Sequence, residues 1–197
     1  IHETLNVSRE TFLMLEKFVN LLLKWNKKIN LISKNSTTVI WQKHVIPSAR
    51  LIKLIEAKEP LIMDVGSGAG FPGIIISIIK GWQVVLVEKN RKKCVFLKEA
   101  QKIIKSNIII ENKTIEETRN FSPDIIVSRG VTNISNFLKL TSKFLNNRVK
   151  VMLIKGDKCQ EEIKESIDDG WVFDYEIKPD VVDKSSTVVI MSNFKNL

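Results

Sequence analysis

Five short apolar runs, separated by segments of helical length, constrain the fold of this chain more than any other feature. The runs are LIMDV (61–65), QVVLVE (83–88), NIIIE (107–111), DIIVS (124–128) and KVMLIK (150–155). Strands that are apolar on both faces are covered on both sides, and strands that alternate with helices form parallel sheets. The pattern therefore predicts an α/β fold, a three-layer sandwich around a mostly parallel sheet.

The C-terminal part of the chain predicts two further strands. WVFDYEI (171–177) and TVVIMSNF (187–194) are joined by the polar stretch KPDVVDKSS (178–186), in which no helix is expected. Neighbouring strands that are linked without a helix form antiparallel pairs. We therefore expect a seven-stranded sheet that ends in an antiparallel hairpin.

Two helices are predicted before the first strand. Apolar residues recur every three or four positions over residues 8–26, as in an amphipathic helix. A second helical stretch covers about residues 38–55, with Pro47 as a potential break, because proline lacks a backbone donor. We expect residues 1–58 to form a helical extension packed on a domain of residues 59–197, the two parts making one compact unit.

Composition narrows the class of protein and of partner. No stretch approaches the roughly 18 consecutive apolar residues of a membrane span, and the N-terminus is too polar for a signal peptide, so we expect a soluble cytoplasmic protein without a membrane partner. Cys94 and Cys159 belong to no metal-binding pattern, so we expect neither a disulfide framework nor a metal site. The net charge of +9 attracts nucleic acid, but it is equally compatible with basic residues spread over solvated faces.

The glycine-rich stretch GSGAGFPG (66–73) lies between the first apolar run and an apolar helical segment. Glycines in this position let a ligand touch the backbone, and the helix N-terminus offers free N–H groups. Gly68, Gly70 and Gly73 also spell GxGxxG, and Glu88 ends the next apolar run, where an acid can bind ribose hydroxyls. Two ligands fit this frame: a dinucleotide and S-adenosyl-L-methionine.

Asp64, which directly precedes the loop, favours the second ligand. Two like charges about 4 Å apart repel by on the order of 1 kcal/mol in water and about 4 kcal/mol at an effective dielectric constant of 20, so a carboxylate here disfavours a pyrophosphate. An ammonium and a sulfonium suit the same position. We therefore expect S-adenosyl-L-methionine, while an NAD(P)-dependent oxidoreductase and a non-catalytic RNA-binding module with a vestigial pocket stay open as alternatives.

Several stretches resemble a known family over nearly the whole chain. They are LLKWNKKINL (22–31), WQKHVIPS (41–48), DVGSGAGFPGI (64–74), NRKKCVFLKEA (90–100), IVSRG (126–130) and LIKG (153–156). In this order they resemble the bacterial small-subunit ribosomal RNA guanine-N7 methyltransferase G family, also called glucose-inhibited division protein B. The resemblance implies a class I, Rossmann-like methyltransferase that transfers a methyl group from S-adenosyl-L-methionine to N7 of a guanine in 16S rRNA.

The resemblance also implies roles for individual residues. Gly66 and Phe71 would line the methionine and ribose part of the cofactor, and Glu88 would hold the ribose. The adenine would be framed by Ile115 and Glu116. With Arg129 at the mouth of the active site, the expected cofactor-binding set is Asp64, Gly66, Gly68, Gly70, Phe71, Glu88, Ile115, Glu116 and Arg129.

Two positions depart from the family pattern. Pro47 stands where the family usually has Asp, which leaves open any part of this helix in RNA docking. Thr114 stands where the family usually has Arg, which leaves the adenine edge less well defined.

Guanine N7 carries an unprotonated lone pair, so in-line transfer needs no general base, no metal and no covalent intermediate, and orientation supplies much of the acceleration. Arg129 could grip a phosphate or guanine O6, or pair with a surface carboxylate. Lys155 is a candidate RNA contact with the same open alternative as Arg129, a carboxylate partner. Arg91 and Lys92 are candidate RNA contacts with the open alternative of a solvated helix face. His44 is expected to be a packed, hydrogen-bonded histidine. The expected partner is 16S rRNA or the small ribosomal subunit, bound by a monomer.

Overall fold

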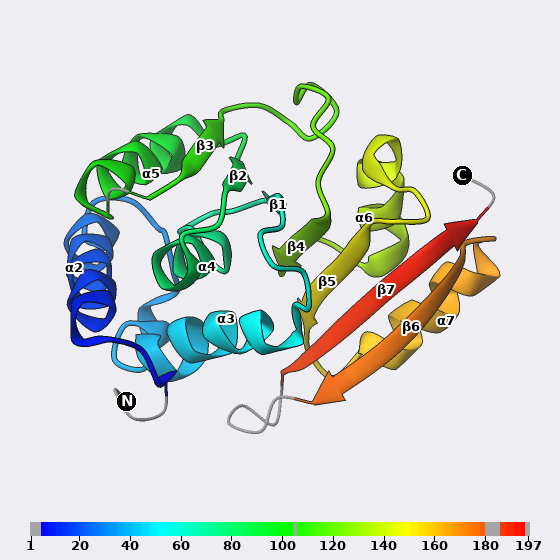
Figure 1. Cartoon of the computed structure of the whole chain (residues 1–197), viewed down its shortest axis with the longest axis horizontal. Helices are drawn as coiled ribbons and strands as arrows, with labels where there is room; N and C mark the ends of the chain where they lie inside the picture. The colour runs from blue at the N-terminus through cyan, green and yellow to red at the C-terminus, as the bar shows by residue number, and fades with distance from the viewer. Residues whose placement is uncertain (1–4, 105, 180–185, 196–197) are drawn as a thin grey trace.

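A seven-stranded sheet with the order β3-β2-β1-β4-β5-β7-β6 forms the centre of the protein (Figure 1). The computed structural model describes residues 5–104, 106–179 and 186–195. The strands are β1 (Ile62–Val65), β2 (Val84–Val87), β3 (Ile108–Glu111), β4 (Ile125–Arg129), β5 (Lys150–Lys155), β6 (Val172–Pro179) and β7 (Thr187–Lys195).

Strands β1 to β5 pair in parallel, whereas β7 runs antiparallel to both of its neighbours, β5 and β6. The mostly parallel sheet with an antiparallel hairpin at one edge is therefore confirmed. The structure adds that β6 is the outer strand and that β7 is inserted between it and β5. Most of the polar stretch between these two strands, residues 180–185, lies outside the described residues.

Helices cover both faces of the sheet, with α2, α3, α4 and α5 on one side and α6 and α7 on the other (Figure 1). The helical segments are α2 (Arg9–Asn26), η1 (Lys34–Ser36), η2 (Trp41–Val45), α3 (Ile46–Leu51), η3 (Ile52–Leu54), α4 (Gly73–Lys80), α5 (Arg91–Ile104), α6 (Ile134–Thr141), η4 (Ser142–Phe144) and α7 (Cys159–Asp168). In the described part of the chain, none of them is long and apolar enough to cross a membrane.

Side-chain alternation along the strands divides the core into two layers. Ile62 of β1 packs in the apolar cluster under α2, α4 and α5, and Met63 packs in the cluster under α6 and α7. Because successive strand residues point to opposite faces, a continuously apolar run serves both layers at once. The next residue of β1, Asp64, must therefore point toward α4.

The N-terminal helix α2 shares the first of these clusters. Its buried residues Leu15, Phe18 and Leu22 pack with the sheet, and Ser8 caps the helix by accepting a hydrogen bond from the Thr11 amide at 3.2 Å. Phe18 meets Phe71 of the glycine loop edge to face, with ring centroids 5.6 Å apart. The division at residue 58 stays a prediction, but these contacts tie α2 to the candidate site.

Pro47 does not interrupt the second helical stretch, contrary to the potential break considered above. Helical turns continue from Trp41 to Leu54, and the proline occupies the first turn of α3. Before it, η2 is a π-helical turn in which the Ile46 amide donates to the Trp41 carbonyl. The wider turn accommodates a residue that has no backbone donor of its own.

Candidate functional site

A cavity of about 590 Å³ opens at the carboxyl ends of β1, β2 and β4. Pockets for small molecules and cofactors occupy roughly 300–1,000 Å³, and in open α/β sheets they lie at this edge. Seven residues of the predicted cofactor-binding set line the cavity: Gly66, Gly68, Phe71, Glu88, Ile115, Glu116 and Arg129. The cavity lining does not include the other two, Asp64 and Gly70.

The glycine loop forms the floor of the cavity. Gly68 has a φ of +55°, and a Cβ added there would meet no atom nearer than the Gly66 carbonyl oxygen at 3.7 Å. A side chain at this position would therefore enter the cavity. Gly66 has a φ of +71°, and its Cβ would lie 2.4 Å from Cγ2 of Val131. The bare backbone thus leaves room for a ligand at one glycine and for a neighbouring loop at the other.

Glu88, just after β2, combines a structural and a ligand-facing position. Its Oε2 accepts a hydrogen bond from the Gly68 amide at 2.9 Å, and its Oε1 accepts one from the Asn90 amide at 2.7 Å. Each carboxylate oxygen has a second lone pair. The side chain lines the cavity although it is only 7% exposed, so it holds the glycine loop and offers fixed acceptors to a ligand.

Asp64 does not face the cavity, which corrects the interpretation that its charge selects the ligand. Its side chain is fully buried beneath α4, where Oδ2 accepts a hydrogen bond from the Gly73 amide at 2.9 Å. Burial raises the pKa of Asp64 to about 7, the nearby Glu88 charge adds to this, and the Gly73 hydrogen bond opposes it. A Cβ on Gly73 would lie 2.7 Å from that oxygen, so the glycine permits the contact. Asp64 therefore anchors the loop from below.

Arg129 ends β4 and lines the cavity together with His44 of η2. The His44 ring stacks on Phe71, with centroids 4.9 Å apart and an interplanar angle of 27°. Burial lowers the pKa of His44 to about 4, with smaller contributions from the charges of Arg129 and Lys43. The expectation of a hydrogen-bonded histidine is wrong, because both ring nitrogens are buried and have no hydrogen-bond partner among the described residues.

The segment after β3 forms the opposite end of the cavity. Lys113, Thr114, Ile115 and Glu116 all line it, so the Thr114 departure from the family pattern falls within the site. The backbone here is held from outside, because Nζ of Lys143 donates to the Glu116 carbonyl at 2.8 Å. An apolar wall at Ile115 beside polar backbone suits a planar aromatic ligand group.

Lys155 pairs with a carboxylate, which was the alternative to its prediction as an RNA contact, and its side chain is largely buried. Its side chain is 10% exposed and its Nζ lies 2.6 Å from Oε2 of Glu162 and 2.8 Å from the Thr132 carbonyl oxygen. The same Glu162 oxygen accepts a hydrogen bond from the Ile134 amide at 2.9 Å. Lys155 and Glu162 therefore hold the connection between β4 and α6, which contains the cavity-lining residue Val131.

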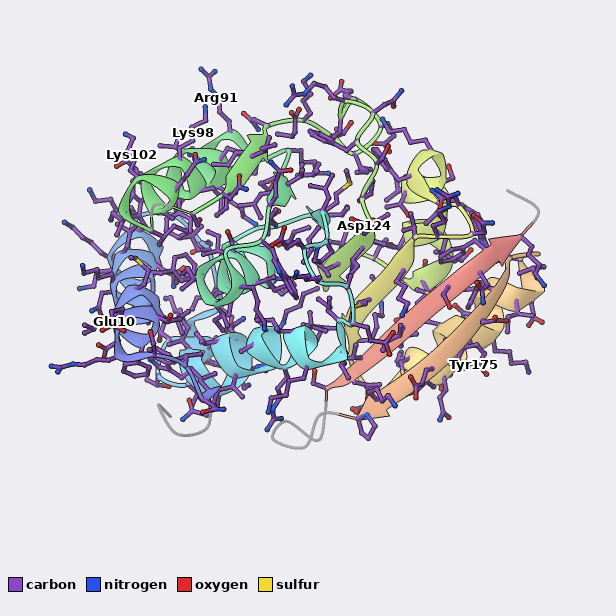
Figure 2. All side chains as sticks on the ribbon, in the orientation of Figure 1. Glu10, Arg91, Lys98, Lys102, Asp124 and Tyr175 are labelled. Atoms are coloured by element: carbon purple, nitrogen blue, oxygen red, sulfur yellow. The ribbon has the colours of Figure 1, made fainter. Side chains whose placement is uncertain are left out.

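The two other predicted RNA contacts, Arg91 and Lys92, are exposed in the first turn of α5. Figure 2 shows Arg91 projecting outward from this helix, on the side that also carries Lys98 and Lys102. The flanking residues Lys89 and Lys93 line the cavity. The N-terminal end of α5 thus brings positive charge to the cavity rim.

Sequence reasoning missed the N-terminal wall of the cavity, which includes Leu31, Ile32 and His44. The turn before this wall is shaped by Asn26, whose Oδ1 accepts hydrogen bonds from the amides of Leu31 and Ile32 at 2.8 and 3.0 Å. The stretch WNKKINL, which carries the family resemblance, contains both Asn26 and Leu31. That motif was the available signal, but its position beside the glycine loop depends on the tertiary fold.

Comparison with solved structures shows the fold. The ribosomal protein L11 methylase from Lactobacillus delbrueckii subsp. bulgaricus superposes with a TM-score of 0.64 at 14% identity, covering 77% of this chain and 78% of that chain. M. jannaschii TYW2, crystallised in complex with AdoMet, superposes with a TM-score of 0.60 at 20% identity, covering 80% and 78%. The predicted class I, Rossmann-like methyltransferase fold is confirmed.

Sequence comparison shows the family. A family model described as rRNA small subunit methyltransferase G matches residues 12–187. Two proteins named ribosomal RNA small subunit methyltransferase G, from Gluconobacter oxydans (strain 621H) and Rickettsia bellii (strain OSU 85-389), are 36% and 38% identical to this chain. The alignments cover 97% and 98% of this chain and 98% and 99% of those proteins.

These findings favour a transferase over the oxidoreductase and over the non-catalytic RNA-binding module. Among the described residues, no group of three or more His, Cys, Asp or Glu side chains is arranged to hold a metal ion. Because the family model spans most of the chain and the relatives align over nearly their whole length, the chain belongs to the family of rRNA small subunit methyltransferase G.

Proposed function

We propose that this protein transfers a methyl group from S-adenosyl-L-methionine to N7 of a guanine in 16S rRNA, acting as a cytoplasmic monomer on the small ribosomal subunit or its rRNA. Family membership supports rRNA as the substrate. The proposed cofactor is supported by the cavity at the carboxyl ends of the strands, where Glu88 is fixed beside an open glycine loop.

The residues present fit S-adenosyl-L-methionine. Gly68 leaves open space where any other residue would project into the cavity. Glu88 is held by two backbone amides and keeps lone pairs for ribose hydroxyls. Ile115 supplies an apolar surface for adenine, and the segment that includes Glu116 frames it. Gly66 and Phe71 would border the methionine part.

When bound, S-adenosyl-L-methionine supplies a methyl group on a positively charged sulfur. The protein's own part is to orient the acceptor and to exclude water. Because guanine N7 has a free lone pair, no side chain has to remove a proton before transfer. Arg129, at the carboxyl end of β4, can donate hydrogen bonds to a phosphate or to guanine O6 without being consumed.

Positive charge at the rim supports an RNA substrate. Arg91 and Lys92 are exposed at the N-terminal end of α5, next to the cavity-lining Lys89 and Lys93. Arginine and lysine side chains neutralise phosphates and release counterions, which gives affinity without reading sequence. Specificity for one guanine then depends on the cavity itself.

Two measurements test this function. Calorimetry with S-adenosylhomocysteine should show binding, whereas NAD⁺ should show none. Small ribosomal subunits and naked 16S rRNA from cells that lack this protein should accept a labelled methyl group, and mass spectrometry should place it on N7 of one guanine. A methyl group on an exocyclic amine, or binding of NAD⁺ in the cavity, would overturn the proposal.

A further inference from the structure

His44 is a buried polar side chain that the cofactor-binding residues do not explain. It lines the cavity from the N-terminal side, stacked on Phe71, and neither ring nitrogen has a hydrogen-bond partner among the described residues. Buried polar groups in native proteins are nearly always hydrogen-bonded, and an exception calls for a specific reason. A histidine kept only for packing would be expected to have a partner, or to be replaced by an apolar ring.

The position of His44 assigns it to one end of the cavity. Glu88 and the segment with Ile115 and Glu116 lie after β2 and β3, on one side of β1 in the sheet. Arg129 ends β4, on the other side of β1, and its charge acts on His44. If Glu88 holds the ribose and Ile115 the adenine, the His44 and Arg129 end is left for the methyl acceptor.

The chemistry of this end suits a purine with an oxo group at position 6. Guanine presents two acceptors on this edge, N7 and O6, and N7 must stay free to accept the methyl group. A neutral imidazole offers one N–H donor, and a guanidinium only donates. Burial and the nearby charges of Arg129 and Lys43 keep His44 neutral at pH 7, so its ring does not repel a cationic donor. The 6-amino group of adenine would face two donors.

The His44 imidazole can turn a ring nitrogen toward the cavity without leaving its plane. A half turn about χ2 exchanges each imidazole nitrogen with a ring carbon, and this torsion has a broad profile. The stack on Phe71 is compatible with both orientations, because a half turn preserves the ring plane. An arriving base would therefore supply the hydrogen bond that the unliganded protein lacks.

We propose that His44 forms the base-binding subsite of this enzyme, donating an imidazole N–H hydrogen bond to the 6-oxo oxygen of the target purine. The proposal rests on the function proposed above and extends it to a residue that contacts the substrate. His44 is not a general base in this role. It holds the base so that N7 faces the methyl donor.

Two variants separate hydrogen bonding from packing. His44→Phe keeps an aromatic ring on Phe71 and removes both ring nitrogens, whereas His44→Gln restores an N–H donor. Because the nitrogens have no partner among the described residues, His44→Phe should fold with an unchanged or higher Tm. It should bind S-adenosylhomocysteine as the wild type does and transfer methyl groups to undermethylated small subunits at least about tenfold more slowly. His44→Gln should recover part of that rate.

A second readout does not depend on activity. The chain has two histidines, His2 and His44, so a protein with nitrogen-15-labelled histidine gives a simple NMR spectrum that His44→Phe assigns. With S-adenosylhomocysteine present, GMP should shift the His44 imidazole nitrogen signals and AMP should not.

The outcomes distinguish this proposal from the proposed function. A His44→Phe variant with the wild-type transfer rate would overturn the subsite. So would an equal loss of S-adenosylhomocysteine binding, which would place His44 in the cofactor site instead. A wild-type protein that methylates no subunit RNA contradicts the proposed function, and a shift of the His44 signals specific to GMP would then still support the subsite.

Discussion

Asp64 shows how one buried carboxylate affects the whole glycine loop. The side chain lies under the N-terminal end of α4, where the Gly73 amide is its hydrogen-bond donor, and its Oδ1 has no partner among the described residues. Burial favours the neutral form and raises the pKa of Asp64 to about 7, above the ordinary value of 3.8. Between about pH 4 and pH 7, the folded protein therefore keeps a proton on Asp64 that the unfolded chain releases.

Replacing this carboxyl should change how stability depends on pH. The contribution of Asp64 is fully present below about pH 4, and it is lost as the pH rises through about 7. Over that window the free energy of unfolding should fall by up to about 1.4 kcal/mol per pH unit. Urea unfolding at several pH values measures it. Asp64→Asn retains an acceptor for Gly73, so it should lack this slope; identical slopes in both proteins would show that Asp64 does not titrate.

Comparing a valine at Gly68 with a valine at Gly81 separates steric block of the cavity from backbone strain. Gly68 and Gly81 both have positive φ angles, +55° and +69°, so a valine should strain the backbone at either position. A Cβ at Gly81 would meet nothing within 4 Å, whereas Gly68 lines the cavity. By calorimetry, Gly68→Val should weaken S-adenosylhomocysteine binding by more than about tenfold, and Gly81→Val should not. Normal binding by Gly68→Val would mean that the cofactor lies elsewhere.

The connection between β4 and α6 depends on one internal ion pair. Lys155 of β5 and Glu162 of α7 are 10% and 18% exposed, and they hold the Thr132 carbonyl and the Ile134 amide. Directly before Thr132 in this connection, Val131 approaches Gly66 of the glycine loop. Removing one partner of a buried pair leaves the other charge without compensation.

Lys155→Met should therefore destabilise the protein by about 3 kcal/mol, measured by urea unfolding. Lys150→Met is a matched control on the same strand, because Lys150 pairs with Glu56 at 3.2 Å on the surface, with side chains 44% and 87% exposed. Surface pairs contribute about 0–1 kcal/mol, so the control should change little. A Lys155→Met protein with full stability and weakened RNA binding would instead support a direct RNA contact.

Sequence patterns predicted the elements well but not the directions of their side chains. The five apolar runs correspond to β1 to β5, and Gly73–Lys80 is helical as the segment after the loop suggested. Asp64 was misread because its role depends on which face of β1 it occupies and on what covers that face. His44 and Lys155 were misread for a similar reason, since only the tertiary fold places one beside Phe71 and the other beside Glu162.

For the whole molecule, the net charge of +9 matters only if part of it gathers where RNA must enter. The cavity rim offers such a place, because Lys89 and Lys93 line the cavity and Arg91 and Lys92 stand between them on α5. Farther along the same helix, Lys98 and Lys102 project from its outer side (Figure 2). Lys102 already pairs with Glu99 at 2.7 Å. Helix α5 thus carries a rim pair of cations, Arg91 and Lys92, and a remote pair, Lys98 and Lys102.

The rim pair should contribute to RNA binding and the remote pair should not. Filter binding of undermethylated small subunits over a series of KCl concentrations measures the slope of log affinity against log salt. Each phosphate contact to single-stranded RNA adds about 0.7 to that slope, so Arg91→Ala with Lys92→Ala should reduce its magnitude by about 1.4. Lys98→Ala with Lys102→Ala should leave it nearly unchanged. Those cations lie about 9 and 15 Å beyond Lys92 along the helix axis, which is at least about one Debye length, so salt screens them. Equal losses from both pairs would mean that the positive charge acts as a diffuse field over the surface, with no docking rim at the cavity.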